Sequence, residues 1–127
     1  DITFRIIDAL KSATVVFCED TRVAKKLLDL LSQKYNFEIE KKRFISLHSH
    51  NEQEVLKNID PYIFESECIY LSDAGMPCIS DPGAYLVGYL QENNIRYDVL
   101  PGPSAVPLVY AASGFLDSKF LIKTNFY

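Results

Sequence analysis

Two hydrophobic periodicities alternate along the chain, and this alternation limits the possible folds more than any other feature. Short apolar runs typical of buried strands are separated by segments whose apolar residues recur at helical spacing. Strands are expected near residues 14–18, 43–47, 68–71, 97–100 and 119–122, and helices near 2–10, 21–31, 55–63, 86–94 and 104–112. Such alternation favours parallel pairing with right-handed crossovers. The sequence therefore predicts an α/β fold: a three-layer open, mostly parallel sheet with helices on both faces.

Composition limits the chain to one compact domain. It has 127 residues, 48% of them hydrophobic and 13% aromatic, which is enough for a core. No apolar run approaches the ~18 residues of a membrane span, and the start lacks the order of a signal peptide, so we expect a cytoplasmic protein. The cysteines Cys18, Cys68 and Cys78 are odd in number and widely spaced, so they are expected to be free thiols.

The net charge of −4 argues against a large nucleic-acid footprint, because binding to phosphates is driven by Lys and Arg. Any contact with nucleic acid must therefore be local.

The most informative loop is the stretch 72–83, which reads SDAGMPCISDPG and follows an apolar run. Asp81 and Pro82 suit a helix start, as N-cap and first helical residue. The run of turn formers is nevertheless longer than the usual ~2–6 residue connection of α/β units, and long ordered loops tend to carry function. With residues 19–22, 48–51 and 101–104, it makes four strand-end loops expected at one sheet edge, where open α/β sheets bind ligands.

Six motifs occur in the order and spacing of a known family: DIT at 1–3, EDTR at 19–22, LHSHNE at 47–52, the stretch 72–83, PGPSA at 101–105 and SGF at 113–115. In these the chain resembles the ribosomal RNA small subunit methyltransferase I family of the tetrapyrrole methylase superfamily. The resemblance implies S-adenosyl-L-methionine as methyl donor and the ribose 2′-hydroxyl of a cytidine in 16S rRNA as acceptor. It also implies a homodimer and a second domain that closes over the donor.

The resemblance also sets expectations about the extent of the chain. The family's first strand, with its Pro-Ile-Gly-Asn-Leu loop, would lie before Asp1. We therefore expect residues 1–122 to form an N-terminal methylase domain without its first strand, and 123–127 to lead toward an absent second domain. Such a fragment is not expected to catalyse methyl transfer alone.

Donor contacts carried over from the superfamily fall in two loops. Asp73 and Met76 follow the central expected strand, and Ser104 and Ala105 lie in the last strand-end loop. Without function, these would be a turn aspartate, a core methionine and a helix cap. Methyl transfer from a sulfonium is an in-line displacement, so such residues would act mainly by positioning.

A ribose hydroxyl is a poor nucleophile and gains from a positioned base. The candidate catalytic residues are Glu19, Asp20, His48 and His50. Histidine has the unperturbed pKa nearest neutrality, ~6.5, and we expect only one of the pair to face the site. Arg22 and Asn51 are the candidate substrate-binding residues. Arg22 would either brace Asp20 or grip an RNA phosphate, and the sequence does not choose.

Two other functions stay open. Asp20, Asp73 and Asp81 could ligate Mg²⁺ at the strand ends in a phosphoryl-transfer or phosphatase-like enzyme. Neither a phosphate-binding P-loop nor a dinucleotide fingerprint occurs to support a nucleotide site. Alternatively, the chain is a non-catalytic interaction domain.

For the expected helix after residue 18, Thr21 is the candidate N-cap.

Overall fold

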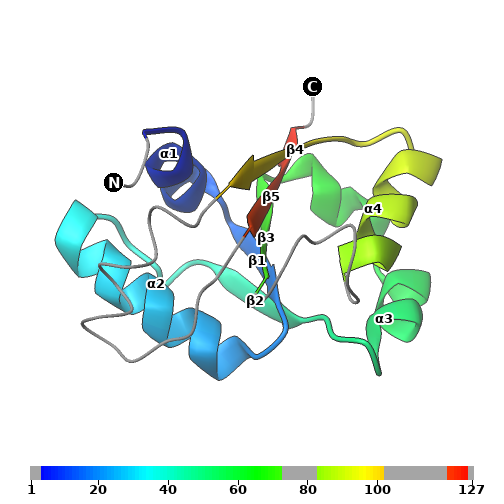
Figure 1. Cartoon of the computed structure of the whole chain (residues 1–127), viewed down its shortest axis with the longest axis horizontal. Coiled ribbons are helices and arrows are strands. Elements are labelled where there is room, and N and C mark those ends of the chain that lie inside the picture. The colour runs from blue at the N-terminus through cyan, green and yellow to red at the C-terminus, as the bar shows by residue number, and fades with distance from the viewer. Residues whose placement is uncertain (1–3, 73–82, 102–119, 126–127) are drawn as a thin grey trace.

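The computed structural model describes residues 4–72, 83–101 and 120–125. A central sheet lies between two layers of helices (Figure 1). The sheet has the strand order β2-β1-β3-β5-β4. Its strands are β1 (Val15–Cys18), β2 (Arg43–Ser46), β3 (Cys68–Ser72), β4 (Arg96–Pro101) and β5 (Phe120–Asn125). Each contains one of the predicted strand segments or most of it, so the predicted strands are confirmed.

The sheet is mostly parallel in direction, with one exception. β1 pairs in parallel with both β2 and β3, whereas β5 lies between β3 and β4 and is antiparallel to both. The predicted α/β fold with a mostly parallel sheet is thus confirmed, and β5 is its one antiparallel strand. Because β5 runs opposite to two neighbours, β3 and β4 themselves point the same way. β5 also continues to Asn125, three residues past its predicted end.

Helices cover both faces of the sheet (Figure 1). The helices α1 (Phe4–Ser12) and α2 (Thr21–Tyr35) cover one face. The other face carries α3 (Glu52–Asn58), the 3₁₀ helix η1 (Pro61–Glu65) and α4 (Gly83–Glu92). The predicted three-layer arrangement is therefore present.

Alternating strand residues feed two separate cores, as the pleat of a sheet requires. Val16 and Cys18 of β1 point toward α1 and α2, where they pack with Leu28. Val15 and Phe17 point the opposite way, into a core that also contains residues of α3, η1 and α4. Phe17 stacks on Phe64, with ring centroids 5.7 Å apart. Both sheet faces are therefore buried, which explains the continuous apolar runs in the sequence.

The prediction of a single third helix over residues 55–63 is wrong, because two shorter helices occur there. The segment is divided into α3 and η1 by extended residues, Ile59 (φ −71°, ψ 142°) and Asp60 (φ −71°, ψ 119°). Pro61 is the cause, because a proline disfavours helical conformation in the residue before it. Asp60 then caps η1 by accepting a hydrogen bond from the Tyr62 N–H at 3.0 Å. The predicted helix over 104–112 lies outside the described residues.

Lys42 secures the end of α1 near the start of β2. Its Nζ donates hydrogen bonds to the carbonyl oxygens of Lys11, at 3.2 Å, and Ala13. A cation is favourable at a helix C-terminus, where carbonyls lack intrahelical donors. Burial lowers the pKa of Lys42.

Cys18 and Cys68 are buried thiols, as predicted, and Cys78 lies outside the described residues. Among the helices that the structure describes, none is both long and apolar enough to cross a membrane.

Candidate functional site

The carboxyl ends of four strands meet at one edge of the sheet. Cys18 at the end of β1 is in register with Ser46 of β2 and Leu71 of β3. Phe120, the first residue of β5, is in register with both Ser72 and Pro101, the last residues of β3 and β4. The four predicted loops therefore all start from this edge. Residues 73–82 and 102–119 lie outside the described residues.

The loop after β1, here called the β1–α2 turn (residues 19–22), is organised by Asp20. Asp20 is the N-cap of α2, with extended backbone (φ −122°, ψ 115°), and its Oδ1 accepts a hydrogen bond from the Arg22 N–H at 2.9 Å. Thr21 was predicted as this cap, and that is wrong: Thr21 is already the first helical residue. Both residue types cap helices well, so only the backbone conformation decides between neighbours.

Arg22 pairs with Asp20 across the same turn. Its Nη2 lies 3.4 Å from Oδ2 of Asp20, and the Arg22 side chain is 90% exposed. The hydrogen bonds from the Arg22 side chain and then its backbone N–H hold the pKa of Asp20 below its ordinary value. A carboxylate held ionised in this way is a weak proton acceptor at neutral pH. The brace expected of Arg22 is thus present, while the exposed guanidinium leaves the phosphate contact a prediction.

The loop after β2, here called the β2–α3 turn (residues 47–52), is closed by Asn51. Asn51 Oδ1 accepts a hydrogen bond from the His48 N–H at 2.7 Å, and its Nδ2 donates to the Ser46 carbonyl at 3.0 Å. Ser46 Oγ donates to the Glu19 carbonyl at 3.0 Å, which joins this turn to the β1–α2 turn. The Asn51 amide therefore stabilises the turn, and substrate binding by this residue remains an untested prediction.

The two histidines lie on the same turn but differ in their environment. The His50 N–H donates to Nδ1 of His48 at 3.2 Å, and the ring centroids are 5.9 Å apart. Because Nδ1 of His48 accepts a hydrogen bond, the neutral His48 ring carries its proton on Nε2. His48 is half-buried, and His50 is exposed. No described residue hydrogen-bonds the His50 ring, so His50 is the better-placed proton acceptor of the two.

Glu52 is the first residue of α3. In the sequence it stood out only as the last residue of the motif at 47–52, which predicted no role for its side chain. It is 0% exposed, and its Oε1 accepts a hydrogen bond from the Leu86 N–H of α4 at 3.1 Å. An acidic residue in a first helical turn is usually solvated, so its position alone does not predict burial. Only the packing of α3 against α4 reveals this contact.

The predicted donor contacts Asp73, Met76, Ser104 and Ala105 all lie outside the described residues. So do Asp73 and Asp81 of the magnesium alternative. Within the described part of the chain, no group of three His, Cys, Asp or Glu side chains could hold a metal ion. The magnesium site therefore remains untested.

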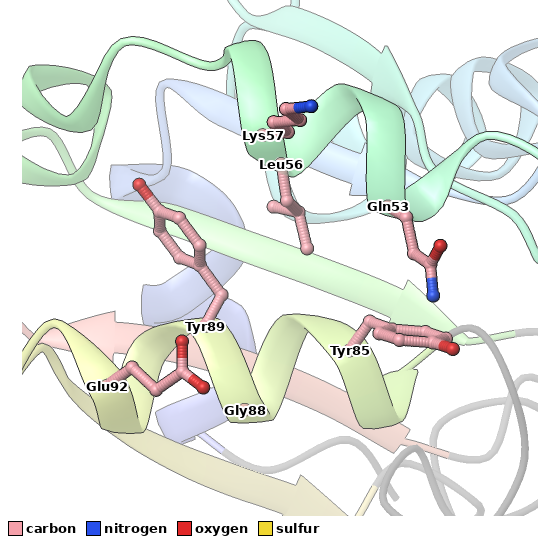
Figure 2. A pocket seen from close by; sticks show the side chains of 7 residues that line it. All are labelled: Gln53, Leu56, Lys57, Tyr85, Gly88, Tyr89 and Glu92. Atoms are coloured by element: carbon pink, nitrogen blue, oxygen red, sulfur yellow. The ribbon is translucent and has the colours of Figure 1, made fainter.

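A groove of about 410 Å³ separates the outer surfaces of α3 and α4 (Figure 2). Gln53 of α3 and Tyr85 of α4 lie opposite each other at one end of the groove, and Leu56 and Tyr89 lie farther along it. Burial and the charge of Asp60 raise the pKa of Tyr89. None of the described residues that line this groove is a candidate catalytic residue, so the strand ends remain the candidate site.

Comparison with known proteins adds an independent line of evidence. The sequence model of the family described as "Tetrapyrrole (Corrin/Porphyrin) Methylases" matches residues 1–123. The chain is 48% identical over 121 residues to "Ribosomal RNA small subunit methyltransferase I" of Campylobacter fetus subsp. fetus, covering 94% of the chain and 45% of that protein. The protein of the same name from Helicobacter pylori strain J99 is 46% identical over 127 residues, with 94% and 44% covered.

A more distant relative of this name, from Thermotoga maritima, is 39% identical over 124 residues, with 97% of the chain and 53% of that protein covered. The chain spans about half the length of the curated relatives it matches. The resemblance found in the six sequence motifs is confirmed by these matches.

Proposed function

Because the chain belongs to the tetrapyrrole (corrin/porphyrin) methylase family, we propose that it is part of an S-adenosyl-L-methionine-dependent rRNA methyltransferase. The acceptor is the ribose 2′-hydroxyl of a cytidine in 16S rRNA of the small ribosomal subunit. The observation that carries the proposal is the family match over residues 1–123. Relatives named as small-subunit rRNA methyltransferases support the choice of rRNA among possible acceptors.

The sheet edge fits a bound methyl donor in one specific respect. The ends of β3 and β4 are both in register with Phe120, so the loops carrying the four expected donor contacts start from neighbouring points. Asp73 directly follows β3, and Ser104 follows β4 by three residues. Asp73, Met76, Ser104 and Ala105 would hold the donor between these two loops, where open α/β sheets bind ligands.

S-adenosyl-L-methionine supplies an electrophilic methyl group on a sulfonium. The transfer forms a bond from the ribose oxygen to the methyl carbon and breaks the sulfur–carbon bond, and the hydroxyl proton passes to a base. His50 is the proposed proton acceptor, because its ring is exposed and no described residue hydrogen-bonds it. His48 and Asn51 hold the backbone of this turn, and Arg22 would contact an RNA phosphate.

The remaining expectations from the family are also proposals. The protein works in the cytoplasm as a homodimer, and a second domain closes over the donor. The chain described here corresponds to the N-terminal domain, and its isolated form is not expected to transfer methyl groups.

Titration calorimetry with S-adenosylhomocysteine, with and without Mg²⁺, tests the donor site. We expect binding without metal, weakened by Asp73→Ala and unaffected by Asp8→Ala, which removes an exposed carboxyl on α1. The same titration on the protein at its natural length shows whether a missing segment is needed. Absence of binding by the natural-length protein would contradict the proposal, and binding only with Mg²⁺ would favour the phosphoryl-transfer alternative.

A further inference from the structure

Among the residues whose side chains the structure describes, Glu52 is the only buried Asp, Glu, Lys or Arg. Its side chain accepts a hydrogen bond from the Leu86 N–H of α4 at 3.1 Å, although the two residues are 34 positions apart in the sequence. Figure 2 shows the starts of the same two helices from outside. Gln53 follows Glu52 in α3, Tyr85 precedes Leu86 in α4, and these two side chains face each other across the groove. The starts of α3 and α4 are therefore held side by side.

Leu86 is the fourth residue of α4, so its N–H lies in the first turn of the helix. The N-terminus of a helix also carries partial positive charge, which favours a carboxyl nearby. The bond from Glu52 thus places a carboxyl at the end of α4 where the helix favours negative charge.

Capping alone does not explain why the acceptor comes from another helix. A Ser, Thr, Asp or Asn next to α4 in sequence would serve at a solvated position, whereas burying a carboxyl carries a desolvation cost. A long-range buried contact differs from a local cap in one way: it fixes two distant segments relative to each other. The identity of those segments therefore decides what Glu52 does.

Both segments belong to the proposed active site. Glu52 directly follows Asn51 in the turn that carries His48 and His50, and Asn51 hydrogen-bonds that turn closed. α4 begins at Gly83, directly after residues 73–82 of the sequence, which contain the proposed donor contacts Asp73 and Met76. One carboxyl thus connects the segment with the proposed base to the segment with the proposed donor contacts.

We propose that Glu52 is a positioning residue that fixes the start of α4 relative to the β2–α3 turn, and so aligns the methyl donor with the base. This inference rests on the proposed function. In-line transfer is sensitive to such alignment, since a misplacement of ~1 Å can cost ~10²-fold in rate.

The test compares Glu52→Ala, Glu52→Gln and Leu90→Val in the protein at its natural length. Glutamine keeps an oxygen that accepts the Leu86 N–H, whereas alanine removes it. Leu90 is also buried in α4 but lies at the helix end away from Glu52, so its substitution weakens the packing without touching the contact. We expect Glu52→Ala to weaken S-adenosylhomocysteine binding by ~10-fold or more, with a smaller loss for Glu52→Gln and none for Leu90→Val.

Amide hydrogen exchange provides a second readout that does not depend on the ligand. Exchange at residues 83–87 should be faster in Glu52→Ala than in the wild type, while the far end of α4 changes little; Leu90→Val should show the reverse. In Glu52→Ala, kcat for methyl transfer to small ribosomal subunits should also fall at saturating donor, where weaker donor binding no longer limits the rate.

The possible outcomes separate the two proposals. If the wild type binds S-adenosylhomocysteine and both folded Glu52 variants bind it equally well, the positioning role is overturned while the proposed function stands. If Leu90→Val weakens binding as much as Glu52→Ala, Glu52 acts only through general stability, which also overturns the role. If the wild type binds no donor analogue, the proposed function fails and the donor alignment fails with it; exchange then decides only whether Glu52 fixes α4.

Discussion

The β1–α2 turn and the β2–α3 turn follow neighbouring parallel strands and contain carboxyls at helix starts, but they use them in opposite ways. In the first, Asp20 binds residues within two positions of itself, and its partner Arg22 is largely exposed. In the second, Asn51 joins two backbone groups, and buried Glu52 contacts a different helix. The first turn is a local cap, whereas the second connects distant parts of the site.

This difference has a physical consequence for substitutions. An exposed ion pair contributes little to stability, since water and salt screen it. A hydrogen-bonded group inside a protein is harder to remove, because its partner then loses an acceptor or donor that water does not replace. Changes in the β2–α3 turn should therefore have larger effects than matched changes in the β1–α2 turn.

The largest expected difference concerns catalysis. His50→Gln should slow methyl transfer to small ribosomal subunits by ~10²–10⁴-fold, the usual contribution of a positioned base. Asp20→Asn should cause a smaller loss, because Arg22 already holds the pKa of Asp20 below its ordinary value. Single-turnover rates of the natural-length protein measure both. A larger loss in Asp20→Asn would move the base to the β1–α2 turn.

The next effect concerns stability. Asn51→Ala should lower the free energy of unfolding by about 1–3 kcal/mol, because the His48 N–H and the Ser46 carbonyl each lose a partner. Asn58→Ala is the matched control: this exposed amide at the other end of α3 donates to the Glu54 carbonyl. Urea unfolding of the chain, followed by circular dichroism, gives both values. Equal losses would remove the distinction between a connecting and a local amide.

A smaller effect is expected where the two turns meet. Ser46→Ala removes the hydrogen bond from Oγ to the Glu19 carbonyl and should cost about 0.5–1.5 kcal/mol in unfolding free energy. Ser32→Ala, which removes a comparable bond to the Asp29 carbonyl within α2, is the control and should cost less. The same urea titration applies. If Ser46→Ala is neutral, the two turns are independent.

The smallest effect concerns acid. Because the folded-state pKa of Asp20 is lowered, its contribution is present above the unfolded-state pKa and is lost as pH falls through the folded value. Asp20→Asn keeps a residue that caps helices but has no charge to titrate. The melting temperature of the wild type should therefore exceed that of Asp20→Asn at neutral pH, and the gap should narrow in acid. A gap independent of pH would mean that the Arg22 pair contributes nothing.

Strand positions could be predicted because they depend on local composition. All five predicted strands occur, since short apolar runs bounded by polar residues have few other structures available. The direction and place of β5 could not be predicted in the same way. Its position between β3 and β4 depends on pairing with strands distant in sequence, which the run 119–122 does not encode by itself.

The same distinction explains the candidate site. Asp20, His48 and Asn51 could be placed at strand ends from the pattern alone, although choosing Thr21 as cap was wrong by one residue. The division of the third helix was predictable from Pro61 and was missed. The buried contact of Glu52 was not predictable, because it depends on how α3 and α4 pack together.

The central claim is that the methyl donor binds at the carboxyl edge of the sheet. Nuclear magnetic resonance of the ¹⁵N-labelled protein at its natural length, titrated with S-adenosylhomocysteine, tests this location residue by residue. The account predicts the largest amide shift changes at residues 73–76 and 104–105, the proposed donor contacts, with smaller changes at the start of α4 and in the two turns at residues 19–22 and 47–52. Largest changes at the opposite edge, around Thr14, Arg43 and Glu67, would contradict it.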